Sequence, residues 1–135
     1  MLTLKQQLMH DEGLRLHPYR DTVGKLTIGF GRNLDDVGIT RREAEIMLDN
    51  DIEQVRLELS RFDWFDQLDS SRRDVIMNMC FNLGLPTLLI FENMIAALSS
   101  HQYQRAADEM LDSKWARQVG DRAERLAEVM RNEHC

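Results

Sequence analysis

The sequence predicts a mainly α (α+β) fold in which a small β-hairpin lobe and a helical lobe are joined by one long helix. Strand formers punctuated by glycine occupy residues 14–34, a pattern typical of a β-hairpin or meander. From Thr40 onward, apolar residues recur at helical spacing instead. The chain also has only two prolines and seven glycines, fewer turn residues than many β-sandwiches need.

The first helix is expected over residues 3–12. Thr3 and Gln6 have the spacing of a capping box, in which each residue satisfies a backbone N–H of the other. Gly13 is suited to the position that follows a helix, because glycine readily adopts positive φ. Glu12 should therefore lie at the end of this helix.

The β-bearing lobe is expected over about residues 14–38. An isolated hairpin is only marginally stable, so this lobe must lean on helices. Thr40 and Glu43 form a second capping box, which should open the helix that joins the lobes, over about 40–59.

The helical lobe is expected over about 60–135, together with the N-terminal helix, within a single domain spanning 1–135. Its central helix should begin at Asp69 or Ser70 and end at Gly84, because this segment has the broadest apolar face. The remaining predicted helices are one after Pro86 that contains Phe91, Met94, Ile95 and Leu98, one over about 102–111, and one that begins near Asp121.

Composition and charge exclude several classes of protein. Seventeen Lys and Arg against 23 Asp and Glu give a net charge of −6, which disfavours a general nucleic-acid binder. No apolar stretch is long enough for a membrane span, so stable membrane insertion is not expected. The N-terminal residues also lack the pattern of a secretory signal, which predicts a cytoplasmic protein unless something else releases it.

The cysteines and histidines indicate neither a disulfide framework nor a metal site, and no cofactor is expected. Cys80 lies in an apolar helical pattern, as a buried inert thiol would, and Cys135 is the last residue. The four histidines are scattered singly, without metal-ligand spacing.

Two carboxylates and a threonine are the candidate catalytic groups. Glu12 and Asp21 flank the change from helix to hairpin, and Thr27 follows on a predicted strand. The chain must fold back here, which can bring all three to one wall. Glycoside hydrolysis needs such a pair, one carboxyl protonated and the other ionised. The separation of Glu12 and Asp21 does not by itself identify a catalytic pair. Asp21 could equally be a turn residue, and Glu12 an ordinary exposed acid on a surface helix.

The run from Glu12 to Gly31 resembles the signature of the T-even-type phage lysozymes, glycoside hydrolase family 24. That signature is E-G-x-x-x-x-x-Y-x-D-x-x-G-x-x-T-I-G-x-G, and every fixed position is met. The resemblance covers nearly the whole chain in order. Further similar segments lie at 39–45, 68–73, 78–84, 106–107, 113–115 and 120–123.

The resemblance implies a lysozyme-like two-lobed fold and a muramidase activity. Such an enzyme hydrolyses the β-1,4 bond between N-acetylmuramic acid and N-acetylglucosamine in peptidoglycan and inverts the anomeric centre. Glu12 matches the family's general acid, Asp21 the carboxylate that activates water, and Thr27 the residue that helps to seat that water.

The resemblance also implies two substrate-binding residues. Arg122 matches an arginine that pairs with the catalytic glutamate, although its position equally suits a surface helix arginine. Phe81 matches a cleft aromatic, and core packing explains it nearly as well. The sequence departs from the family at Arg32, where a histidine is common, so any histidine–carboxylate pair there is lost. The loop 33–38 is also short for the family.

The expected partners are peptidoglycan glycan strands, and the expected state is a monomer. As a phage endolysin, the chain would wait in the host cytoplasm until a holin opens the membrane, and then act on the periplasmic cell wall. The sequence does not distinguish a phage endolysin from a bacterial or prophage muramidase. Two further alternatives are a lytic transglycosylase, which needs a single acid, and a non-catalytic wall-binding or tail-structural domain. The complete set Glu12, Asp21 and Thr27 argues against both.

Overall fold

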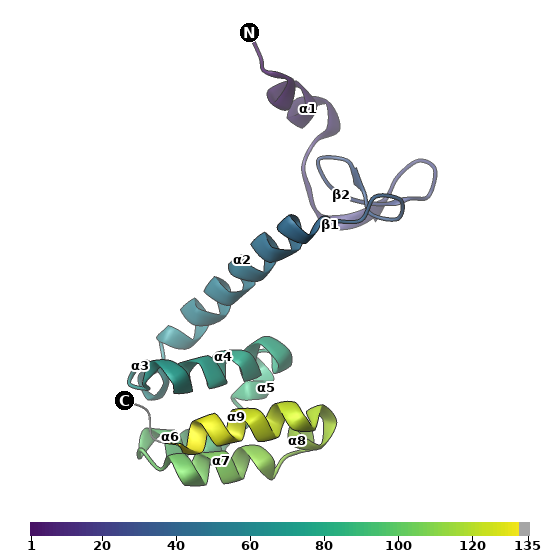
Figure 1. Ribbon diagram of the computed structural model, residues 1–135. Helices are drawn as coiled ribbons and strands as arrows, with labels where there is room; N and C mark the ends of the chain where they lie inside the picture. Colours follow the sequence, from purple (N-terminus) through teal and green to yellow (C-terminus); the bar gives the residue numbers. More distant parts are fainter. Residues whose placement is uncertain (133–135) are drawn as a thin grey trace. The chain divides into compact units, whose positions relative to one another are not determined.

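The computed structural model describes residues 1–132 and divides into two compact units (Figure 1). The first unit is Met1–Met47, and the second begins at Leu48, inside the helix α2 (Arg41–Ser60). Helices dominate, with one small sheet, so the predicted mainly α fold is confirmed. Cys135 and the end of the predicted domain lie outside the described residues.

The first unit opens with α1 (Leu4–Glu12), which begins and ends as the sequence predicts. The Thr3 hydroxyl accepts a hydrogen bond from the Gln6 N–H at 3.1 Å, and the Thr3 N–H donates to Gln6 Oε1 at 2.9 Å. Gly13 follows the helix with φ at 71°, a conformation that side chains disfavour, and turns the chain into the sheet.

A three-stranded antiparallel meander follows α1, which confirms the predicted hairpin or meander. Its strands, in spatial order, are β1 (Arg15–Arg20), β2 (Leu26–Gly29) and β3 (Arg32–Asn33). Tyr19 pairs with Thr27, and Ile28 pairs with Arg32. β2 is the central strand, so both of its edges are hydrogen-bonded.

The second predicted capping box is also present, at the start of α2. The Glu43 N–H donates to the Thr40 hydroxyl at 3.1 Å, and the Thr40 N–H donates to Glu43 Oε1 at 2.9 Å. Two backbone donors that a helix start leaves unpaired are thereby satisfied.

The second unit is helical. Asp69 caps its central helix, α4 (Ser70–Leu83), and Gly84 ends it, as predicted. The helices after α2 are α3 (Asp63–Asp66), α4 (Ser70–Leu83), α5 (Leu85–Leu88), α6 (Glu92–Ser99), α7 (Tyr103–Leu111), α8 (Lys114–Val119) and α9 (Asp121–Arg131).

The prediction of a single helix after Pro86 is wrong, because the structure has two helices there, α5 and α6. Phe91 separates them with φ −73° and ψ 59°, outside the helical region. Its ring packs edge-on against Trp115, with centroids 6.4 Å apart. Because this contact is with a residue distant in the sequence, the spacing of apolar residues does not predict the break between the two helices. The short helices α3 and α8 were not predicted either.

The hydrophobic core lies in the second unit. Its buried apolar side chains run from Leu59 to Met130 along the chain, and α4, α7 and α9 supply many of them. Cys80 is 2% exposed in this core, which confirms the predicted buried thiol. Within residues 1–132, none of the helices has the length and apolar character needed to cross a membrane.

Candidate active site

Glu12 is the last residue of α1, and its carboxylate lies against the backbone of Gly31. A Cβ built on Gly31 would be 2.7 Å from Glu12 Oε2. Gly31 also has φ at 78°, so the position suits glycine for two reasons. Glu12 lines an open cavity of about 340 Å³ together with Gly13, Leu14, Arg15 and Tyr19. Glu12 thus lies beside the backbone of Gly31 and lines an open cavity.

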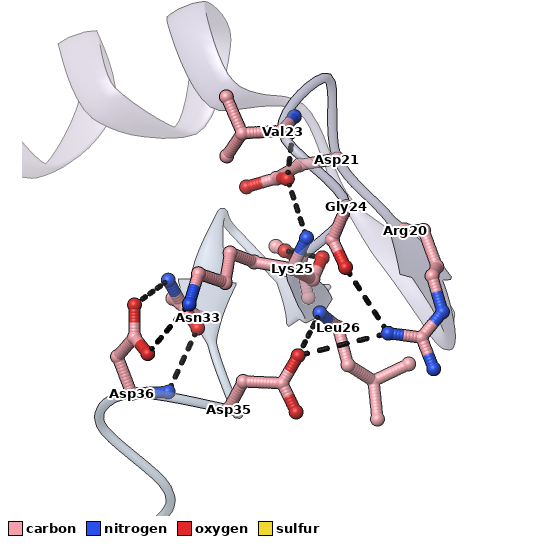
Figure 2. A network of polar contacts seen from close by, with 10 residues as sticks. Arg20, Asp21, Val23, Gly24, Lys25, Leu26, Asn33, Asp35 and Asp36 are labelled. Atoms are coloured by element: carbon pink, nitrogen blue, oxygen red, sulfur yellow. Dashed lines mark hydrogen bonds and ion pairs between the residues drawn. The ribbon is translucent and has the colours of Figure 1, made fainter.

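Asp21 lies in the turn between β1 and β2, where backbone donors fix its carboxylate (Figure 2). Oδ1 accepts hydrogen bonds from the N–H of Val23 at 3.0 Å and of Lys25 at 2.8 Å. The Asp21 N–H donates to the Lys25 carbonyl at 2.9 Å, which closes the turn. Oδ2 accepts no hydrogen bond from the residues that the structure describes, so it is left for a solvent donor.

Thr27 is on β2, with 4% of its surface exposed. Its hydroxyl donates to the Lys25 carbonyl at 2.9 Å. The same carbonyl accepts the Asp21 N–H, so the backbone of Lys25 holds both side chains. Because the hydroxyl proton is engaged, the Thr27 oxygen can act only as an acceptor toward a water molecule.

The strand β2 therefore connects all three candidate catalytic residues. Lys25 precedes the strand and holds Asp21, Thr27 lies within it, and Gly31 follows it and supports Glu12. The role of the Lys25 backbone was not predicted, since hydrogen bonds of the main chain leave no mark on residue type.

The short loop after β3 is fastened to the same turn by polar contacts (Figure 2). Lys25 Nζ lies 3.1 Å from Asp36 Oδ1, and the Leu26 N–H donates to Asp35 Oδ2 at 2.7 Å. The Asn33 amide donates to Asp36 Oδ2 at 2.9 Å. These bonds order the loop that the sequence identifies as short.

Arg32 makes an ion pair that was not predicted from the sequence. Its guanidinium donates to Glu43 Oε1 at 2.9 Å and to Oε2 at 2.6 Å. It also donates to the Gly38 carbonyl at 3.0 Å. The hydrogen bonds from Arg32, helped by the Thr40 N–H, lower the pKa of Glu43 to about 2. The position at which the resemblance led us to expect a histidine thus holds an arginine that is paired with a carboxylate.

Phe81 and Arg122 line one cavity of about 280 Å³ in the second unit. Arg122 donates to Asn78 Oδ1 at 2.9 Å from Nε and at 2.7 Å from Nη2, which fixes the guanidinium. Phe81 is 47% exposed, so it is not a core residue. The expected pairing of Arg122 with Glu12 would join the two compact units and stays a prediction.

Among residues 1–132, no three His, Cys, Asp or Glu side chains gather as a metal ion would require.

Comparison with known proteins gives consistent results. A family model described as phage lysozyme matches residues 9–133. The chain is 27% identical to Probable T4-type lysozyme 1 of Dictyostelium discoideum, over 95% of this chain and 93% of that protein. It is 33% identical to an endolysin of Acyrthosiphon pisum secondary endosymbiont phage 1, over 78% and 72%. It is also 24% identical to the pre-baseplate central spike protein Gp5 of Enterobacteria phage T4, over 96% of this chain and 28% of that protein.

Proposed function

This chain belongs to the phage lysozyme family and is a glycosidase that hydrolyses peptidoglycan, and we propose that it is an inverting muramidase with Glu12 as its general acid. The bond cleaved is the β-1,4 link between N-acetylmuramic acid and N-acetylglucosamine. The observation that carries the proposal is that β2 and its flanking turns connect the three candidate catalytic side chains.

Glu12 donates its proton to the glycosidic oxygen as the bond to the anomeric carbon breaks. The cavity beside its carboxyl gives a sugar access, and the contact with Gly31 limits the positions that the carboxyl can adopt. Protonating the leaving oxygen matters because an alkoxide is a poor leaving group.

Asp21 and Thr27 hold the attacking water on the opposite face of the sugar. The water donates one hydrogen bond to Asp21 Oδ2 and the other to the Thr27 oxygen, which directs its lone pair at the anomeric carbon. Asp21 takes the proton of the water as the new bond forms, and the configuration inverts. Because the Lys25 backbone binds both residues, the two acceptors are fixed relative to each other.

The test is the Glu12→Gln variant, which keeps the shape of the side chain but has no acidic proton to donate to the glycosidic oxygen. We expect release of reducing ends from purified peptidoglycan to fall by at least about a hundredfold, with an unchanged melting temperature. Asp11→Asn is the matched control, because Asp11 is the exposed neighbouring carboxylate on the same helix. Wild-type activity in a folded Glu12→Gln protein would overturn the proposal.

The mass of the released muropeptides distinguishes this reaction from the alternatives. A hydrolase adds water and leaves a reducing end, whereas a lytic transglycosylase leaves an anhydro end. A structural domain releases neither. We expect reducing ends from the wild type.

A further inference from the structure

The position of the Glu12 carboxylate depends on the turn between β2 and β3. Glu12 Oε2 and Cδ would lie 2.7 and 3.2 Å from a Cβ on Gly31. These atoms can approach so closely only because Gly31 has no side chain. A shift of this turn by a few tenths of an ångström would therefore be transmitted to the carboxyl.

On the β3 side, the backbone hydrogen bonds of the sheet hold this turn only weakly. β3 has two residues, and Arg32 pairs with Ile28 directly after Gly31. A strand of this length offers few ladder hydrogen bonds. Something besides the ladder should therefore fix Arg32.

The side chain of Arg32 supplies that restraint. Both terminal nitrogens bind Glu43, at 2.9 and 2.6 Å, and Nη1 also binds the Gly38 carbonyl at 3.0 Å. Arginine suits such a contact because its planar fork matches a carboxylate in two places. Glu43 is itself held by the Thr40 N–H at the start of α2, at 2.9 Å. The ion pair between Arg32 and Glu43 thus connects the residue after Gly31 to the first turn of α2.

We propose that Arg32 and Glu43 are positioning residues for the reaction: by anchoring the β2–β3 turn, they hold Gly31 against the Glu12 carboxyl. This inference rests on the proposed role of Glu12 as general acid. It assigns Glu43 a task beyond capping α2.

The chain provides clean variants for this proposal. Glu43→Gln removes the charge but keeps a side chain that completes a capping box. Arg32→Lys keeps the charge but cannot make the forked contact. Glu45→Gln is the matched control, since Glu45 pairs with Arg41 at 3.4 Å on the exposed surface of the same helix.

The experiment measures kcat and KM on purified peptidoglycan, well below the melting temperature of each variant. We expect Arg32→Gln and Glu43→Gln to lower kcat about tenfold with little change in KM, because small misplacements of catalytic groups are costly. The double variant should be no worse than either single one. Arg32→Lys should recover part of the activity, and Glu45→Gln should match the wild type. Gly31→Ala should lose about a hundredfold.

A second readout reports on Glu12 directly. With ¹³C-labelled glutamate, the Glu12 carboxyl resonance should move in Gly31→Ala, Arg32→Gln and Glu43→Gln, and stay in place in Glu45→Gln. Variants that melt earlier but keep the wild-type kcat and Glu12 resonance would overturn the proposal. An active Glu12→Gln protein or an inactive wild type would instead overturn the proposed function. The resonance still tests the positioning in either case.

Discussion

Arg72 is a buried arginine that fastens the C-terminal helix to the core. Its side chain is 8% exposed. Nε donates to the Met130 carbonyl at 2.7 Å, Nη2 donates to the Asn132 carbonyl, and Nη1 lies 2.9 Å from Asp69 Oδ1. The guanidinium also stacks on the Tyr103 ring, 3.8 Å from its centroid. One side chain thereby joins α4 to α7 and to the end of α9.

We predict that Arg72→Met lowers the free energy of unfolding by about 3 kcal/mol. The substitution keeps much of the side-chain volume but leaves a partly shielded aspartate and two carbonyls without their donor. Urea unfolding followed by circular dichroism measures the loss. Arg125→Met, at an exposed position of α9, should change stability by no more than about 0.5 kcal/mol. Equal losses in the two variants would contradict the prediction.

At the scale of elements, Glu43 joins β3 to α2 through Arg32 and also completes the capping box. The pKa of its carboxyl is lowered from 4.5 to about 2, chiefly by the hydrogen bonds from Arg32. Between these two values the unfolded chain binds more protons at this residue than the folded protein does. The contribution of Glu43 to stability is therefore complete above about pH 4.5 and is lost as the pH falls toward 2.

We predict that the stability difference between the wild type and Glu43→Gln shrinks as the pH is lowered from 6 through about 4.5 toward 2. Melting temperatures measured across this range provide the test. In Glu45→Gln, where the lost partner is an exposed i,i+4 arginine, the difference should be small throughout. If the difference in melting temperature between the wild type and Glu43→Gln were constant with pH, the charge of the Glu43 carboxylate would not be what stabilises the folded protein.

At the scale of the whole molecule, the apolar core and the candidate catalytic groups lie in different units. The core side chains belong to the second unit, whereas in residues 1–47 the one buried residue is Thr27. The first unit is held by capping boxes, turns and ion pairs such as those around Asp21 and Arg32.

We predict that native-state hydrogen exchange is slowest in α4 and α9, where opening must expose the core. Amides of β2 and β3 should exchange through smaller openings with a lower free energy, because little apolar surface is uncovered. Mass spectrometry of the full chain under native conditions measures both. The prediction fails if β2 and β3 are protected as strongly as α4.

Local chemistry allowed the sequence to predict much of the fold. The starts of α1 and α2 depend on capping boxes at Thr3 and Thr40, which are contacts between residues three apart. The end of α4 depends on Gly84, and the meander depends on glycines between strand formers. The boundary between α5 and α6 could not be predicted, because Phe91 leaves the helical conformation where it packs on Trp115.

By itself, the sequence determined the family and the candidates Glu12, Asp21 and Thr27, because a motif preserves residue types in order along the chain. Only the tertiary structure decided how these side chains are held. The Lys25 backbone binds Asp21 and Thr27, Gly31 supports Glu12, and Arg32 finds Glu43 eleven residues away. Such contacts have no fixed spacing, since they depend on where the turns bring the chain back upon itself.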